Sequence, residues 1–500
     1  MKFLSYLKTA LTIPLSIILS APSYLRVGVA TTLNIVLYAV TLRHCIWLEG
    51  RVRRGVFRNW IRHFRYTPKE YHQPTTGEEI VKLVKKSKRL RLFGAGHSFN
   101  SGVVSDETLV SLDKYSGLIC KYTDKKQIAV KGGTRIRDVA KLLHDEGLAF
   151  SALPSHDAQS IAGILSTDVH GTGKIFGTEE EKWGFVSQSV VSLKLIDGKG
   201  EIHECQPSAD LFKTAIGGVG AVGIITEVVV QGVDRFNVRQ KFKRQDISFD
   251  KEGDKENFDE LVDNCLRNNE HFSLYLFPFT NKCQINTWNS TDCEQTFLGD
   301  LREDVSISFD ALLAAWIGNF FAYTGLLKVL PPRFYDLLTK RGTDLVLESN
   351  KGFNRTIYHQ HQELEFTVPF EDTFESCKRF IDLYKECYPS LPYTLIEVRF
   401  TPDKHDRTLI GAGRDRTSTW IDLICNDSYG YKKFYAAAEK LTKKIGARPH
   451  LGKFCESFSK ADMARLHGDN FTKFLNLVEK HDPEGKFAND FTRRLFGHGV

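Results

Sequence analysis

Apolar and polar residues alternate differently in two parts of the chain, with a change near residue 233. Before that point, short apolar runs bounded by turn residues predict strands, and two runs with helical spacing predict helices. The expected elements, in chain order, are the helix 78–88, the strands 90–93, 109–112 and 127–130, the helix 136–146, and the strands 190–196 and 224–230. Many short strands with few helices indicate an α+β domain.

The second part combines charged helices with aromatic strands. Its expected strands are 272–279, 363–368, 395–400 and 419–425, and they fit one antiparallel sheet. The uncharged run 311–327 ends before Pro331 and Pro332. Such a run is more typical of a buried helix than of a membrane contact.

The first 48 residues differ in kind from both parts. Two apolar stretches, 9–25 and 27–42, flank Arg26 and precede an arginine-rich segment. Each approaches the roughly 17 to 25 residues that a membrane-crossing helix needs. We interpret residues 1–48 as a membrane anchor and 49–66 as a linker. A cleaved signal peptide is the alternative, disfavoured by the second apolar stretch and by the absence of a clear cleavage site.

Positive charge lies on both sides of the apolar stretches, with Lys2 and Lys8 before them and the arginines after them. This suits a hairpin with both ends cytosolic. A single span would also place the arginine-rich side, and the rest of the chain, in the cytosol. The organelle stays open.

Bulk composition narrows the classes of function. A chain of 500 residues is too long for a single core. Its net charge of +7 reflects 68 basic against 61 acidic residues, and the basic run 82–91 lies on an expected helix, so a solvated helix face is favoured over nucleic-acid binding. Ten cysteines without a Cys-x-x-Cys pair indicate buried thiols, and no metal site is predicted. Glycosylation sequons would matter only in a secretory lumen. They occur at Asn289, Asn354, Asn426 and Asn470.

The strand 90–93 runs directly into Gly94-Ala95-Gly96-His97-Ser98. The two glycines let backbone N–H groups approach an anion closely, and Ser98 adds a hydroxyl donor, as a diphosphate requires. Taken alone, the segment is equally an ordinary tight turn. It is not the doubly wound dinucleotide fingerprint, because no G-x-G-x-x-G opens a helix.

Two further segments change that assessment. In residues 159–173, small and hydroxyl residues alternate with apolar ones, which suits packing against a large planar ligand. Near the C-terminus, the segment 448–453 reads Arg-Pro-His-Leu-Gly-Lys, and 482–491 follows it. With these segments in this order, residues 57–497 resemble the sugar-1,4-lactone oxidases, flavoproteins of the vanillyl-alcohol oxidase superfamily. That family includes gulonolactone, galactonolactone and arabinonolactone oxidases.

The resemblance implies a two-subdomain, PCMH-type FAD-binding domain at 67–232. It also implies a substrate (cap) domain at 233–500 that contains the antiparallel sheet and a C-terminal flavin-contacting segment. FAD would be held covalently through His97, which otherwise only caps its turn. The remaining implied cofactor contacts are Gly94, Ala95, Gly96, Ser98, Pro154, Ser160, Gly163, Ser166, Thr167, His170, Gly171, Gly173, Gly223 and Ile225.

Glu397 and Arg399 project from the same face of the strand 395–400, whose other face is apolar. Without context, such a pair is usually a surface ion pair. By resemblance, Glu397 accepts a hydrogen bond from the substrate hydroxyl and Arg399 stabilises developing negative charge. His450 and Lys453 would contact the substrate or the N1–C2 edge of the flavin.

Two positions bear on specificity. Leu451 stands where the family usually has tryptophan, so the sequence does not identify the sugar. Pro154 falls about where the family controls oxygen access, and proline there accompanies oxidases. The expected reaction is FAD-dependent oxidation of an L-gulono-, L-galactono- or D-arabinono-1,4-lactone, with O2 giving H2O2, in ascorbate or erythroascorbate biosynthesis. The alternatives are an alditol or polyol oxidase of the same fold, and a membrane-bound flavin dehydrogenase that reduces a cytochrome or quinone.

Overall fold

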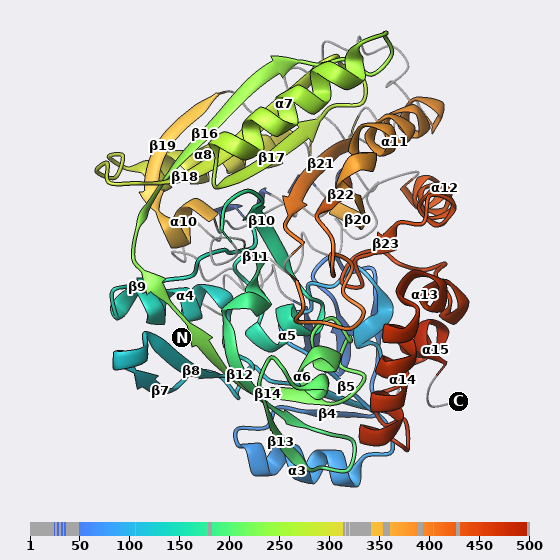
Figure 1. Cartoon of the computed structure of the whole chain (residues 1–500). Coiled ribbons are helices and arrows are strands. Elements are labelled where there is room, and N and C mark those ends of the chain that lie inside the picture. The colour runs from blue at the N-terminus through green and yellow to red at the C-terminus, as the bar shows by residue number, and fades with distance from the viewer. Residues whose placement is uncertain are drawn as a thin grey trace.

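The computed structural model describes most of the chain and divides it into two lobes (Figure 1). The described residues are 50–313 without 106 and 179–182, 342–353, 361–387, 394–426 without 404, 431–497, and a few positions at 25–36, 316 and 320. Most of the two N-terminal apolar stretches and of the run 311–327 lies outside them. Within the described part, no helix is both long and apolar enough to span a bilayer. The membrane anchor therefore stays a prediction.

The first lobe contains two main sheets, with strand orders β13-β12-β14-β8-β7 (antiparallel) and β4-β6-β5 (parallel). The strands are β4 Glu70–His72, β5 Leu90–Phe93, β6 Thr108–Ser111, β7 Leu118–Tyr122, β8 Gln127–Lys131, β12 Val190–Ile196, β13 Ile202–Cys205 and β14 Ile224–Gln231. The helices are α3 Gly77–Lys86, α4 Ile136–Asp145, α5 Ile161–Ser166 and α6 Asp210–Ala215. Two-stranded pairs add β9 Leu148–Ala149 with β15 Val233–Asp234, and β10 His170–Lys174 with β11 Trp183–Phe185. The α+β architecture expected from the patterns is confirmed.

Helix α3 shows how local sequence sets these elements. The Thr76 side chain accepts a hydrogen bond from the backbone N–H of Glu79, which caps the first turn. Ile80 and Val84, one turn apart, are fully buried. The helix then delivers the chain into strand β5, which ends where the Gly94–Ser98 turn begins.

Residues 50–66, expected to be a linker, instead form a packed segment that we call the strap. It contains a small antiparallel sheet, β1 Arg51–Arg53, β2 Val56–Arg58 and β3 Arg65–Tyr66. The apolar residues Phe57 and Trp60 between the strap's arginines are buried, which explains why the segment folds. The strap also lies directly on the glycine turn, since a Cβ added to Gly96 would come within 2.7 Å of the Gly50 Cα.

The second lobe is built on one eight-stranded sheet with the order β19-β16-β18-β17-β21-β22-β20-β23, and the four strands expected from the alternating pattern all belong to it. All its neighbouring strands are antiparallel. The strands are β16 Asn237–Asp246, β17 His271–Leu276, β18 Lys282–Thr291, β19 Thr343–Glu348, β20 His361–Pro369, β21 Thr394–Thr401, β22 Ser418–Asn426 and β23 Arg448–Pro449. The helices that follow or connect them are α7 Asp254–Asn268, α8 Gly299–Leu313, α10 Ser349–Phe353, α11 Thr373–Cys387 and α12 Tyr431–Lys444.

The two faces of this sheet have opposite character. Helices α7, α11 and α12 cover the outer face and bury a large apolar core, which includes Ile396, Val398 and Phe400 of β21. Side chains alternate along a strand, so Glu397 and Arg399 point from the inner face towards the first lobe. The inner face of the sheet can therefore carry the polar side chains of a functional site.

The C-terminal helices α13 Lys460–His467, α14 Asp469–His481 and α15 Asp490–Phe496 return to the first lobe (Figure 1). The Leu90 N–H donates to the Lys486 carbonyl at 2.8 Å, and Arg91 Nη1 donates to the Phe487 carbonyl at 2.6 Å. The segment 482–491 thus packs beside β5 and supports the strand that carries the glycine turn.

Candidate functional site

A cavity of about 360 Å³ lies between the lobes and collects nearly all the predicted site residues. Its size is within the range of small-molecule sites. The predicted residues that line it are Gly94, Ala95, Gly96, His97, Ser98, Pro154, Ser160, Gly163, Ser166, Thr167, His170, Gly223, Ile225, Glu397, Arg399, His450 and Lys453. Segments more than three hundred residues apart in sequence therefore share one cavity.

Gly171 and Gly173 are the predicted cofactor residues that do not line the cavity. Both lie on β10, where a Cβ on Gly171 would come within 2.6 Å of the Leu153 carbonyl and one on Gly173 within 2.0 Å of the Trp183 carbonyl. Their glycines allow close backbone packing. The close packing seats β10, and the expected contact of these two positions with a flavin stays a prediction.

The glycine turn is held from behind by the strap. The Gly50 N–H donates to the Ala95 carbonyl at 2.6 Å, and the Trp60 N–H donates to the Gly96 carbonyl at 3.1 Å. On the cavity side, Gly94 is packed so tightly that an added Cβ would lie 1.8 Å from Ser160 Oγ. The turn therefore has little freedom to move and no space for a side chain at position 94.

His97 is fixed by aromatic and hydrogen-bonded neighbours. Its Nδ1 shares a hydrogen bond of 2.9 Å with Nε2 of His156, and its ring stacks on Trp60 with centroids 5.0 Å apart. Burial, followed by the proximity of His156, lowers the pKa of His97 well below its ordinary value, so the imidazole is neutral. Its Nε2 is buried and makes no hydrogen bond. A neutral, unbonded imidazole nitrogen at the cavity wall is in the state needed for a bond to a ligand.

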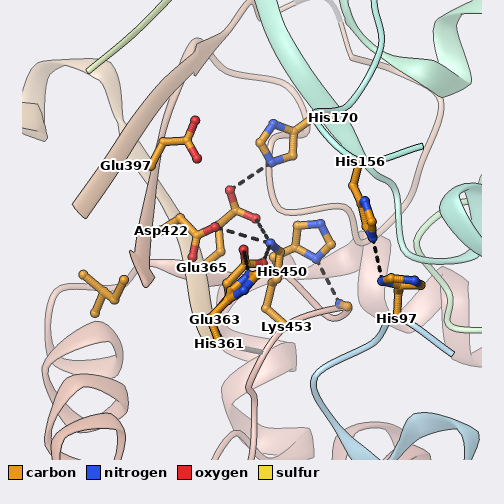
Figure 2. Close-up of polar contacts among 12 residues, drawn as sticks. His97, His156, His170, His361, Glu363, Glu365, Glu397, Asp422, His450 and Lys453 are labelled. Atoms are coloured by element: carbon orange, nitrogen blue, oxygen red, sulfur yellow. Dashed lines mark hydrogen bonds and ion pairs between the residues drawn. The ribbon is translucent and has the colours of Figure 1, made fainter. Parts of the chain in front are cut away.

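On the opposite wall, a row of polar side chains crosses five neighbouring strands. The register places Gln284 opposite Tyr275, Tyr275 opposite Glu397, Glu397 opposite Asp422, and Asp422 opposite Glu365. Three carboxyl groups thus lie side by side, an arrangement that like-charge repulsion disfavours unless cations compensate it. Figure 2 shows Glu365 and Asp422 gathered around the end of Lys453.

Lys453 and Arg399 supply the compensating charge. Lys453 Nζ is ion-paired to Glu363 and lies 3.3 Å from Asp422 Oδ2 and 3.7 Å from Glu365 Oε2. Arg399 Nη2 lies 3.1 Å from Glu365 Oε1, and Arg399 Nε lies 3.5 Å from Glu397 Oε1. The cluster therefore sets four carboxyl groups against two permanent cations.

The excess of carboxyl groups over cations determines which carboxyl group is protonated. Burial would raise the pKa of Glu365, but Arg399 and Lys453 lower it well below its ordinary value. Burial raises the pKa of Asp422 far above its ordinary value, with Glu363 and Glu365 adding to the effect against the opposition of Lys453. Asp422, between two other carboxyl groups in the row, is consequently the member that keeps a proton.

Two histidines connect the walls. His170 Nδ1 donates to the Gly171 carbonyl at 2.8 Å, and its Nε2 lies 3.2 Å from Glu365 Oε1. Burial lowers the pKa of His170, and the adjacent Glu365 carboxylate opposes that effect. His450 Nδ1 accepts from the Gly452 N–H at 2.9 Å, and burial lowers its pKa to about 4. His450 is therefore neutral near pH 7.

Several side chains in the cavity wall were not predicted from the sequence. Glu363, Glu365 and His361 lie on β20, where they alternate with apolar core residues in the same way as Glu397 and Arg399 do on β21. That shared alternation was the available signal. Trp60 and His156 also line the cavity. Leu451, which stands where the family usually has tryptophan, lies in the lining as well.

Comparisons with known proteins find similarity in both lobes. Residues 68–206 match the model of a family described as FAD binding domain. Among solved structures, cholesterol oxidase from *B. sterolicum* is similar with a TM-score of 0.69 at 16% identity, covering 89% of this chain and 97% of that chain. The chain thus consists of an FAD-binding domain and a cap domain with a large antiparallel sheet, and it shares its overall fold with that solved structure.

The residues present fit an FAD. The glycine turn leaves no space for a side chain beside Ser160, and His97 Nε2 is an orphaned buried nitrogen. On the other wall, Arg399 Nε, Glu365 Oε2 and Asp422 Oδ1 are buried without a hydrogen bond. Orphaned polar atoms on both walls are the expected counterpart of a bound cofactor and a polar substrate.

Residues 234–495, more than half of the chain, match the family model described as D-arabinono-1,4-lactone oxidase. L-gulonolactone oxidase of *Bos taurus* is 27% identical over 455 residues, covering 89% of this chain and 99% of that protein. L-gulono-1,4-lactone dehydrogenase of *Mycobacterium tuberculosis* is 25% identical, covering 88% and 99%. D-arabinono-1,4-lactone oxidase of *Candida glabrata* is 32% identical over 244 residues, covering 47% and 44%. The chain belongs to the D-arabinono-1,4-lactone oxidase family and is an FAD-linked sugar-lactone oxidoreductase.

Proposed function

We propose that the protein oxidises an aldono-1,4-lactone, of the L-gulono, L-galactono or D-arabinono type, at the hydroxyl-bearing carbon next to the lactone carbonyl, with O2 as acceptor. The carrying observation is the charged row on the cap wall, directly facing the glycine turn and His97 across one cavity. The product would be a 2-keto lactone, the chemical precursor of ascorbate or erythroascorbate.

The substrate loses two electrons as a hydride from carbon and one proton from its hydroxyl. Bound FAD supplies the hydride acceptor, and O2 with two electrons and two protons gives H2O2. The carboxylate of Glu397 accepts the hydrogen bond from the hydroxyl, which orients the C–H bond. Arg399 stabilises the negative charge that develops on that oxygen. Burial would lower the pKa of Arg399, but the surrounding carboxylates, Glu397 first, raise it, so this cation is permanent.

Lys453 and His450 contribute from the loop that follows β23. Carboxylates surrounding Lys453 raise the pKa of its ammonium despite burial, so it stays charged and places positive charge beside the row. Neutral His450 offers a nitrogen without adding charge.

We further propose that FAD is attached covalently through His97, and that the protein is membrane-associated through residues 1–48 with its catalytic part in the cytosol. The attachment is supported by the buried, unbonded Nε2 of His97. The location is supported by the positive charges that flank the apolar stretches.

A dehydrogenase is the second candidate, because a relative of similar coverage carries that description. Pro154 in the cavity lining supports the oxidase. The two differ only in the electron acceptor. An alditol oxidase would use the same walls with an open-chain substrate.

The test begins with the full chain purified in detergent and precipitated with acid. We expect yellow flavin to stay with the pellet, to be lost from the pellet of His97→Ala, and to remain in that of His361→Ala, another histidine in the cavity wall. Flavin in the wild-type supernatant would refute the covalent bond alone. A protein without flavin would refute the whole proposal.

Turnover is then measured with the three lactones and with xylitol and sorbitol, recording oxygen uptake and H2O2. Lactone-dependent oxygen uptake is the expected result. Reduction of cytochrome c or a quinone without oxygen uptake would assign a dehydrogenase, and turnover of the alditols alone would assign a polyol oxidase.

A further inference from the structure

A second cluster of ligating side chains lies in the first lobe, outside the cavity. Asp197 is in the turn between β12 and β13, His203 is on β13, and His481 is the last residue of α14. None of them lines the cavity between the lobes. The three come together only because α14 returns from the C-terminus to pack on this lobe.

The donor atoms converge on one point. His203 Nε2 lies 2.8 Å from Asp197 Oδ2, and His481 Nδ1 lies 3.2 Å from the same oxygen. One ligand atom from each residue lies within 4.8 Å of the others. The imidazole rings are almost perpendicular, at 87°, with centroids 5.0 Å apart, so the nitrogens approach from different directions. In a tetrahedral zinc site with metal–nitrogen bonds of about 2.0 Å, neighbouring donors are roughly 3.3 Å apart.

The supporting contacts hold the carboxylate in a fixed position. Asp197 Oδ1 accepts from the backbone N–H groups of Lys199 and Glu201, both at 3.0 Å, which leaves Oδ2 for the histidines. Such outer contacts are characteristic of ordered metal sites. The side chain of Asp197 is fully buried, whereas that of His203 is 26% exposed, so an ion from solvent has access past His203.

We propose that Asp197, His203 and His481 bind one divalent transition-metal ion of the zinc type, with the fourth position open to water or to Glu201. Two imidazoles and one carboxylate are a donor set that zinc accepts. The Glu201 carboxylate has Oε2 4.0 Å from His203 Nε2, near enough to close the site by rotation of an exposed side chain. The ion would join the end of α14, just before the segment 482–491 that supports β5, to the β12–β13 hairpin.

The test uses the purified full chain, incubated with ZnCl2 and dialysed against metal-free buffer, with zinc measured by plasma mass spectrometry. We expect one equivalent more in the wild type than in His203→Ala, and the same for His203→Gln, whose amide keeps a donor for Asp197 but is a poor zinc ligand. His72→Ala is the matched control, because His72 is an exposed histidine 2.9 Å from a single carboxylate. It should retain the full zinc content.

Cobalt(II) provides a readout of geometry. The wild type should show the visible absorption of tetrahedral cobalt, and both His203 variants should lack it. The cavity also contains three groups within ligand reach of one another, His170, Glu365 and His450. Zinc that is retained by the His203 variants but lost in His450→Ala would overturn the proposal, as would equal zinc content in all variants. Unchanged flavin content and circular dichroism verify that the His203 variants are folded.

Discussion

The two walls of the cavity are built on different principles. The first-lobe wall consists largely of glycines, small hydroxyl residues and neutral histidines, held in shape by backbone contacts such as those of the strap. The cap wall carries Glu397, Asp422 and Glu365 side by side, with Lys453 and Arg399 between them. The shape of the first wall depends on glycines that leave room for close packing, whereas the second wall depends on cations that compensate its carboxylates. They should therefore fail in response to different substitutions.

Removing one cation should affect the cap wall most. In Lys453→Met, the ion pairs to Glu363, Asp422 and Glu365 are lost and the excess of negative charge in the buried row increases. We expect kcat/KM to fall about 10³-fold while flavin stays bound. Lys378→Met, which removes a partly exposed lysine paired to Asp250 on the surface, should change the rate less than about 2-fold. Retention of a tenth of the wild-type kcat/KM would show that the wall does not depend on this charge.

Adding one methyl group should affect the first wall most. In Gly94→Ala the new Cβ would meet Ser160 Oγ at 1.8 Å and Ser160 Cβ at 2.7 Å, so the turn must move. We expect flavin incorporation from limiting FAD to weaken by about 10²-fold. The control is Gly77→Ala, whose Cβ would meet only Tyr115 Oη at an ordinary 3.7 Å. Full flavin content in Gly94→Ala at limiting FAD would contradict the rigid-turn interpretation.

Lowering the pH should destabilise the fold through both walls, because each wall contains buried neutral histidines. Burial lowers the pKa of His450 to about 4, whereas the unfolded chain protonates near 6.5. A lowered folded-state pKa gives stability that is complete above about pH 6.5 and is lost as pH falls towards 4. From pH 7 to pH 5 this one histidine accounts for a loss of about 2 kcal/mol in the free energy of unfolding. Urea titrations at both pH values measure it, and His450→Gln should reduce the pH dependence. Stability that increases on acidification would exclude this account.

The smallest effect is expected for a substitution in the strap, which packs against the glycine turn of the first wall. Trp60→Leu keeps an apolar side chain in the strap but removes the stack on His97. Aromatic pairs contribute about 1 kcal/mol beyond burial, so the thermal midpoint should fall by a few degrees with flavin still bound. Tyr122→Leu, an exposed aromatic substitution on β7, should leave the midpoint nearly unchanged. Equal midpoints for the wild type and Trp60→Leu would mean that the stack does not stabilise the fold.

The difference between the two walls also explains which parts of the site could be predicted from the sequence. The glycine turn is a contiguous segment whose residue types carry the geometric requirement themselves, so its position at the end of strand 90–93 was predicted correctly. Glu397 and Arg399 were predicted because they share one face of a strand and resemble the Glu-x-Arg motif of the family. Glu365 and Asp422 were missed, since the register that places Asp422 between Glu365 and Glu397 is a property of the sheet.

Two other differences have local physical causes. The strap was expected to be a linker, although its Phe57 and Trp60 supply enough apolar surface to be buried. Gly171 and Gly173 follow the pattern of a ligand turn, and in the structure the groups nearest to an added Cβ at these positions are the carbonyl groups of Leu153 and Trp183. A glycine in the sequence indicates that some group packs closely against the backbone, but it does not identify that group.

The strap also has a practical consequence for anyone shortening this protein. Removing the apolar N-terminal region is an obvious way to shorten the protein, and a cut placed after residue 66 would match the boundary suggested by the pattern of the sequence. Such a cut would delete Trp60 and Gly50, and with them the backbone bonds that hold Ala95 and Gly96. A shortened version that keeps its cofactor should therefore begin before Gly50.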